Sequence, residues 1–195
     1  MQVVWWLTPC AENKNLMPKI LILGYGNPDR EDDGVAWHVL QKLAHYFNRP
    51  ITTMDSLEFD HQSGHVSSPA SRRLPASPDL AFALQLAPEM AEVLAQYQQV
   101  CFIDAHTGAF PEEIRLARLE PGYQSSPFTH HLTAESCLSL AQTLYGHAPD
   151  GVLISIRGYS FGYGVELSEP TALLVEPAVE RIVNWVVQCR EKVKV

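Results

Sequence analysis

The sequence is poor in positive charge and has no long apolar run. Its 195 residues include 14 Lys and Arg against 22 Asp and Glu, which gives a formal net charge of -8. A chain without a basic stripe is a poor partner for nucleic acid or for an anionic membrane surface. No stretch reaches the apolar length that a membrane span requires. We therefore predict neither a nucleic-acid partner nor a membrane partner.

Cysteine is also scarce, and its positions form no motif. The four cysteines have no CxxC pair and no short spacing typical of a zinc site, and they are Cys10, Cys101, Cys137 and Cys189. This pattern favours reduced thiols in a cytoplasmic protein over a disulfide framework. Three of the four stand among apolar residues, which predicts burial.

Nucleotide-binding and nucleophile motifs are missing as well. Gly24 and Gly26 begin a G-x-G-x-x-G pattern, but Asp29 takes the place of the third glycine, where its carboxylate would face a pyrophosphate. The sequence has no Walker loop and no G-x-S-x-G elbow. We therefore expect no organic cofactor and no serine nucleophile, and we interpret the two glycines as allowing a sharp turn between a strand and a helix.

The hydrophobic content of 46% is enough for one substantial core. We divide the chain into an N-terminal extension, residues 1–16, and a single domain, residues 17–195, that begins at Met17. Residues 56–78 are rich in Ser, Pro, His and Arg and lack periodicity. We predict that this stretch is a surface loop.

Strands and helices are expected to alternate along the domain. Continuous apolar runs predict buried parallel strands, and the alternating run 114–119 predicts an antiparallel edge strand. The expected strands are 20–23, 51–54, 100–103, 114–119 and 152–156, and the expected helices are 35–47, 89–95, 133–144 and 177–187. This order predicts the α/β class: a single-domain three-layer sandwich with a mostly parallel twisted sheet and helices on both faces.

Acidic residues follow two of these strands. Ligands of such sheets bind beyond the carboxyl ends of the strands, where Asp32, Asp33 and Asp104 are expected. Consecutive carboxylates repel one another unless a cation or a helix N-terminus compensates them. The structural alternative is that Asp32 caps the helix, that Asp33 is solvated, and that Asp104 forms a turn.

Two adjacent histidines, His130 and His131, precede the helix expected at 133–144. One imidazole with the carboxylates would make a nitrogen and oxygen donor set for a first-row divalent ion. The alternative is an ordinary helix entry with Thr133 near the cap and both histidines exposed. If the protein is a hydrolase, the remaining chemistry is a metal-polarised carbonyl attacked by a carboxylate-activated water.

The ordered set of motifs resembles that of the hydrogenase maturation proteases. The resemblance covers residues 18–190. It is carried by the segments ILILGYGN at 20–27, DDGV at 32–35, FIDA at 102–105, THHL at 129–132, IRG at 156–158 and ELS at 166–168.

This resemblance implies an α/β endopeptidase that removes the C-terminal peptide from the nickel-loaded large-subunit precursor of a nickel-iron hydrogenase. The nickel would be supplied by the precursor and used for recognition. The resemblance implies that Asp33, Asp104 and His130 contact the metal and that Asp33 or Asp104 activates the water. Supporting or alternative positions are Asp32 and His131, and the substrate loop would contain Gly24, Gly26 and Asn27.

A function of another class is a checkpoint module that binds the metallated precursor without cleaving it. The presence of Asp33, Asp104 and His130 together favours the protease. Glu31 and Ala36 stand where the family commonly has glycine, and the loop at 56–78 is unusual. Because loops commonly set partner choice, these differences bear on which hydrogenase is served.

Overall fold

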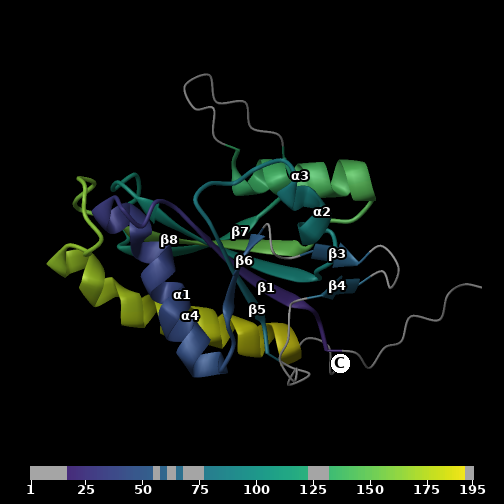
Figure 1. Ribbon diagram of the computed structural model, residues 1–195, viewed down its shortest axis with the longest axis horizontal. Helices are drawn as coiled ribbons and strands as arrows, with labels where there is room; N and C mark the ends of the chain where they lie inside the picture. Colours follow the sequence, from purple (N-terminus) through teal and green to yellow (C-terminus); the bar gives the residue numbers. More distant parts are fainter. Residues whose placement is uncertain (1–16, 55–57, 61–64, 68–76, 123–131, 192–195) are drawn as a thin grey trace, which may run out of the picture.

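The structure is a computed structural model of the 195-residue chain, and it describes residues 17–54, 58–60, 65–67, 77–122 and 132–191. The N-terminal extension expected at 1–16 lies outside the described residues, as do His130 and His131. Figure 1 shows a central sheet between two layers of helices.

The sheet has six strands in the order β2-β5-β1-β6-β8-β7. The strands are β1 (Ile20–Tyr25), β2 (Ile51–Thr53), β5 (Asp79–Ala83), β6 (Gln99–His106), β7 (Ile114–Leu119) and β8 (Asp150–Arg157). All neighbouring pairs are parallel except β7 with β8. The predicted sandwich and the predicted antiparallel edge strand are confirmed.

Two helices cover each face of the sheet (Figure 1). One face carries α1 (Val35–Phe47) and α4 (Glu169–Glu191), and the other carries α2 (Met90–Leu94) and α3 (Ala134–Tyr145). A 3₁₀ turn, η1 (Glu31–Gly34), connects β1 to α1. The predicted helix at 133–144 is confirmed: Thr133 accepts a hydrogen bond from the Ser136 amide at 3.2 Å, and Gly146 ends the helix in the left-handed conformation.

The alternation of side chains along β1 divides the core into two parts. Ile22 packs with the core under α1 and α4, whereas Leu21 and Leu23 pack with the core under α2 and α3. All three side chains have no exposed area. A strand covered on both faces needs apolar residues at every position, which explains the continuous run in the sequence. Three cysteines are buried, as predicted, and none of the three forms a disulfide with a described residue: Cys101, Cys137 and Cys189.

Two predictions about the second quarter of the chain were incomplete. β5 was not predicted, because its five residues, DLAFA, are too few and too mixed in polarity to stand out. The loop expected at 56–78 contains two short strands, β3 (Glu58–Asp60) and β4 (His65–Ser67), that pair antiparallel. The expectation of a plain loop was therefore wrong for these two segments.

The start of the last helix was also predicted wrongly. α4 begins at Glu169, two turns before the predicted start at Pro177. Proline is common in the first turn of a helix, but Pro177 lies inside α4 on its exposed side. Water can satisfy the carbonyl that loses its helical hydrogen bond there, so the helix continues through the proline.

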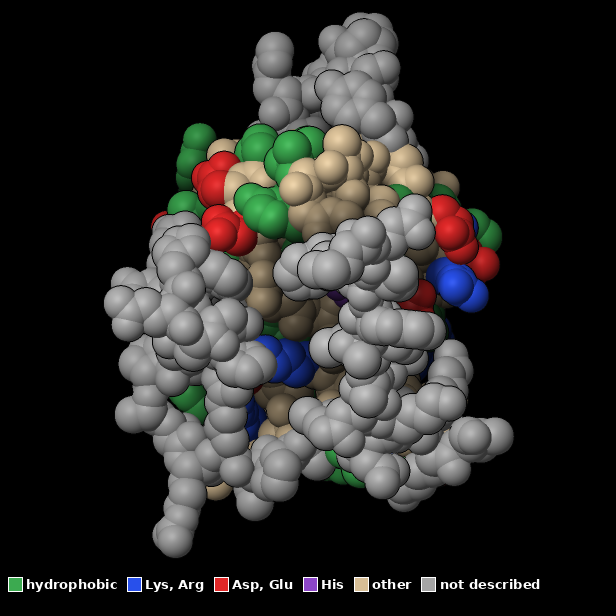
Figure 2. Space-filling model, turned by 90° about the vertical axis from the view of Figure 1, so that its right-hand side faces the viewer, with side chains coloured by type: hydrophobic (Ala, Val, Ile, Leu, Met, Phe, Trp, Pro, Cys, Tyr) green, Lys and Arg blue, Asp and Glu red, His purple; other side chains and the backbone are tan. Residues whose placement is uncertain are grey.

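Figure 2 shows the end of the molecule at which the parallel strands of the sheet begin. Acidic and basic side chains of the described residues are interspersed there instead of forming a patch of one sign. Among the helices of the described residues, none combines the length and the apolarity needed to cross a membrane.

Two glycines with positive φ allow a test of the turn after β1. Gly26 (φ +132°) has the Asp33 carbonyl oxygen 2.1 Å from where a Cβ would lie, whereas Gly146 (φ +73°) has open space. We expect Gly146→Ala to reduce the free energy of unfolding by about 1 kcal/mol and Gly26→Ala to reduce it by clearly more, because a backbone atom must also move. Urea denaturation of the two variants measures the difference, and equal losses would contradict this account.

Candidate active site

The carboxyl edge of the sheet brings together polar side chains from β1 and β6. Gly24 lies opposite Ile103 in the parallel pairing of these strands, so Tyr25 and Asp104 come next to each other. Asp104 was predicted to follow the end of its strand, but β6 continues to His106. The alternative in which Asp104 forms a turn is therefore wrong, and its side chain is held by a rigid strand.

Asp33 reaches the same edge from η1. Its Oδ2 accepts a hydrogen bond from the Asn27 amide at 2.9 Å. The charge of Asp33 contributes to raising the pKa of Asp104, so the two carboxylates lie within electrostatic reach of each other. The structure thus brings together two carboxylates that lie 71 positions apart in the sequence.

Burial raises the pKa of Asp104 to about 7, although hydrogen bonds from Tyr25 and from the Ala105 amide act in the opposite direction. The amide of Ala105 lies 2.8 Å from Asp104 Oδ1. Burial, followed by the charge of Asp104, raises the pKa of Tyr25, so its hydroxyl remains a neutral donor. A carboxyl group with a pKa near neutral pH can accept and release a proton under physiological conditions.

Asp32 is fully buried and accepts four hydrogen bonds from the loop after β8. Its donors are the Tyr159 amide at 2.7 Å, the Ser160 amide at 2.8 Å, and the Ser168 amide and hydroxyl at 2.7 and 2.6 Å. Burial raises the pKa of Asp32, but these donors lower it more, so the pKa lies below its ordinary value. Neither η1 nor α1 has a side-chain cap, so the alternative in which Asp32 caps the helix is wrong.

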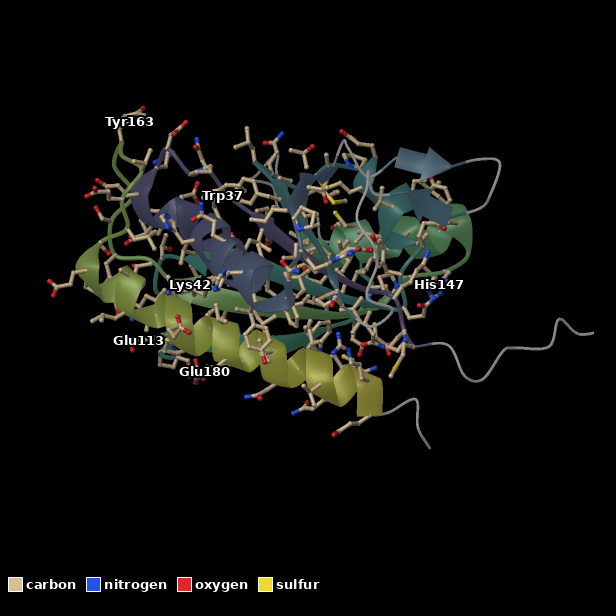
Figure 3. All side chains as sticks on the ribbon, turned by 60° about the horizontal axis from the view of Figure 1, so that its bottom comes forward. Trp37, Lys42, Glu113, His147, Tyr163 and Glu180 are labelled. Atoms are coloured by element: carbon tan, nitrogen blue, oxygen red, sulfur yellow. The ribbon has the colours of Figure 1, made fainter. Side chains whose placement is uncertain are left out.

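Glu31 holds the same loop at a second point. Its Oε2 accepts hydrogen bonds from the Ser160 hydroxyl and, at 2.9 Å, from the Gly162 amide. The hydrogen bond from the Ser160 hydroxyl is the main reason that the pKa of Glu31 lies below its ordinary value. Tyr163, which is 95% exposed, projects from the outer end of this loop (Figure 3). Glu31 and Asp32 therefore both hold the loop after β8 in place by hydrogen bonds.

The expected substrate-loop residues form the turn between β1 and η1. A Cβ on Gly24 would lie 2.8 Å from Leu40 Cδ1, so this glycine lets α1 pack closely on the strand. Gly26 needs its positive φ, and Asn27 Oδ1 accepts a hydrogen bond from the Asp29 amide at 2.9 Å. The interpretation of the glycines as turn residues agrees with this geometry.

The expected nitrogen ligand cannot be placed, because His130 and its alternative His131 lie outside the described residues. Within the described part of the chain, no three His, Cys, Asp or Glu side chains are grouped to hold a metal. Asp33 and Asp104 are two oxygen donors at one edge, which suits a first-row divalent ion that brings other ligands with it.

Two residues near Asp104, Tyr25 and His106, were missed or undervalued in the sequence. Tyr25 stands between the two glycines and looks like a turn residue. Nothing in the sequence pattern predicts its hydrogen bond to Asp104, which lies 79 positions further along the chain. His106 is buried, and its Nδ1 accepts a hydrogen bond from the Gly108 amide at 3.2 Å. Burial lowers the pKa of His106, and the charge of Arg157 lowers it further.

Replacing Asp32 tests its role in holding the loop. We expect Asp32→Asn to lower the free energy of unfolding by about 2–4 kcal/mol at pH 7, because an amide replaces an acceptor that serves four donors. A carboxyl group whose pKa is lower in the folded state stabilises at pH values above its unfolded pKa, and this contribution is lost as the pH falls through the folded pKa. The difference from the wild type, measured by urea denaturation, should therefore shrink from pH 7 to pH 3. A constant difference would contradict this role.

The titration of Asp104 depends on Tyr25. We expect Tyr25→Phe to move the pKa of Asp104 above about 7, because it removes a hydrogen bond that favours the ionised form. Carbon NMR of the aspartate carboxyl groups across a pH series measures the shift. Tyr145→Phe, on the exposed end of α3, is the control that should leave the titration unchanged. An unchanged pKa in Tyr25→Phe would refute the interaction.

Solved structures with the same fold include two hydrogenase maturation enzymes. The NiFe hydrogenase maturation protease HycI from Thermococcus kodakarensis KOD1 is 21% identical, with a TM-score of 0.55 over 91% of this chain and 97% of that one. The hydrogenase maturating endopeptidase HybD from E. coli is 16% identical, with a TM-score of 0.57 over 87% of this chain and 93% of that one.

A solution structure of an endopeptidase from Escherichia coli is 17% identical, with a TM-score of 0.56 over 84% of this chain and 89% of that one. No protein-family model and no curated protein matches the sequence. At sequence identities of 21%, 16% and 17%, these three similarities establish a shared fold. The fold of this chain is that of the hydrogenase maturation proteases.

Proposed function

We propose that this protein is an endopeptidase that removes the C-terminal peptide from the nickel-loaded large-subunit precursor of a nickel-iron hydrogenase. The observation that supports it most directly is the meeting of Asp33 and Asp104 at the carboxyl edge of the sheet, where ligands of such folds bind. The shared fold with proteins named as maturation endopeptidases agrees with this assignment.

The two carboxylates would act on a metal that arrives with the substrate. In this proposal Asp33, Asp104 and His130 complete the coordination of the nickel already held by the precursor. An unloaded precursor would lack this contact and would bind less well. Because the carboxylates alone are an incomplete ligand set, in this proposal the nickel comes with the precursor and is not a resident metal of this protein. The proposed reaction involves no organic cofactor.

Asp104 is the better candidate for the proton transfer. Its pKa of about 7 lets it take a proton from a water molecule that attacks the scissile peptide and pass one to the leaving amine. Asp33, at the turn after β1, would orient the water and the metal. The reaction would take place in the cytoplasm, where cysteines that form no disulfide, such as Cys101 and Cys137, remain reduced.

Asp104→Asn should reduce processing of the nickel-loaded precursor at least about 100-fold, because it removes the proton acceptor. The fold should persist, since a carboxyl group with a raised pKa destabilises the folded state once it ionises. Asp29→Asn, an exposed residue of the turn after β1, is the matched control. The mass of the precursor before and after incubation is the readout. Full processing by Asp104→Asn would refute the assignment.

The dependence on nickel separates the protease from the checkpoint module. Wild-type protein is incubated with the precursor from the same source, with and without nickel. Loss of a C-terminal peptide only from the loaded precursor supports the proposal. Binding of the loaded precursor without any change of mass would favour the checkpoint module. His130→Ala and His131→Ala, compared in the same assay, identify which imidazole contributes.

A further inference from the structure

Two arginines, Arg115 and Arg157, lie on the face of the sheet that also carries Asp104. Arg115 on β7 is opposite Ser155 on β8, and Arg157 stands two residues further along β8. Asp104 on β6 is also opposite Ser155. Residues two apart on a strand share a face, so Asp104, Arg115 and Arg157 lie on one face of the sheet. Arg157 is opposite His106 in the pairing of β6 with β8, and the charges of both arginines act on His106.

Both guanidinium groups are held by aromatic rings. Arg115 lies over the ring of Phe110 at 4.0 Å, and Arg157 lies over the ring of Tyr159 at 4.9 Å. A Cβ on Gly108 would come within 3.2 Å of the Arg157 Nη2, so the guanidinium packs against the backbone of this glycine. Stacking fixes the plane of a guanidinium and leaves its N–H donors directed outward from the edge of that plane.

Neither guanidinium has an ion pair or a hydrogen bond with any of the described residues, and Arg157 Nε is buried without a partner. Other arginines of the chain find oxygen acceptors. Arg49 pairs with Asp79 at 2.5 Å, Arg118 pairs with Glu120 at 3.5 Å, and Arg181 donates to the Ile114 carbonyl at 2.7 Å. In a chain with a net charge of -8, two half-buried arginines without a carboxylate partner are conspicuous.

An unpaired buried donor has a cost in free energy that a ligand can remove. The planar guanidinium fork matches a carboxylate best, since both groups offer two parallel hydrogen-bonding atoms. The position between Arg115 and Arg157 is therefore suited to an anion, on the face of the sheet that carries the proposed catalytic carboxylate.

We propose that Arg115 and Arg157 bind a carboxylate of the precursor, in the segment next to the peptide bond that is cleaved. This inference rests on the proposed function, and it assigns the two arginines as determinants of substrate specificity. The carboxylate can come from an acidic side chain of the excised peptide or from the C-terminus of the precursor.

The first experiment is steady-state processing of the nickel-loaded precursor by Arg115→Gln, Arg157→Gln and Arg157→Lys. We expect KM to rise roughly tenfold or more in the two Gln variants, with kcat changed less than about twofold. Arg157→Lys keeps the charge without the fork and should give an intermediate KM. Arg118→Gln is the matched control, because Arg118 lies on β7 but on the other face, with its own acidic partners.

The second experiment identifies the source of the carboxylate. One form of the precursor carries a C-terminal amide, and others have each acidic residue of the excised peptide replaced by its amide. The responsible change should raise the KM of the wild type and have no further effect on Arg157→Gln. Additive effects for every precursor form, an equal rise of KM in Arg118→Gln, or a fall of kcat at unchanged KM would overturn the inference.

A third measurement keeps this inference separate from the proposed function. Binding of a labelled synthetic peptide that spans the cleavage site and the C-terminal extension is followed by fluorescence anisotropy, without any cleavage. Arginine-dependent binding by a protein that cleaves no precursor would support the carboxylate site and refute the protease. Cleavage by the wild type together with unchanged KM in both Gln variants would refute the site alone. If Arg157→Gln does not fold, as judged by circular dichroism, Arg115→Gln decides.

Discussion

The parallel pairing of β1 with β6 is the constraint on which the rest of the site depends. It aligns the carboxyl ends of two strands, so that the side chains after their apolar runs, Tyr25 and Asp104, meet at one edge. Helices cover both faces of these strands, and the interior is therefore apolar. Polar groups can be accommodated where the strands leave the core, and the chemistry of this fold is confined to that edge.

The three consecutive acidic residues in η1 have different roles because a 3₁₀ turn points them in different directions. Glu31, with a φ of +48°, and the buried Asp32 both accept hydrogen bonds from the loop after β8. Asp33 accepts a hydrogen bond from the Asn27 amide, and its charge acts on Asp104. The repulsion expected among adjacent carboxylates is relieved by donors from a loop more than 120 residues away.

Asp32 and Asp104 illustrate how the surroundings determine the state of one residue type. Both are removed from water, which raises the pKa of a carboxyl group. Four strong donors reverse this effect at Asp32, whereas the bonds from Tyr25 and Ala105 do not reverse it at Asp104. The first carboxylate is suited to holding a loop and the second to exchanging a proton. On the face of the sheet that carries Asp104, Arg115 and Arg157 supply positive charge that the described residues leave unpaired.

The sequence by itself determined the fold class, most of the strands, the helix that begins after Thr133 and the edge at which Asp33 and Asp104 lie. These features depend on local periodicity and on the general geometry of parallel sheets. It did not determine β5, the first two turns of α4 or the role of Asp32, because these depend on partners distant in the chain. The pairing of Tyr25 with Asp104 and the unpaired guanidiniums were decided by tertiary structure alone: hydrogen bonds and burial belong to neighbours in space, and no spacing in the sequence encodes them.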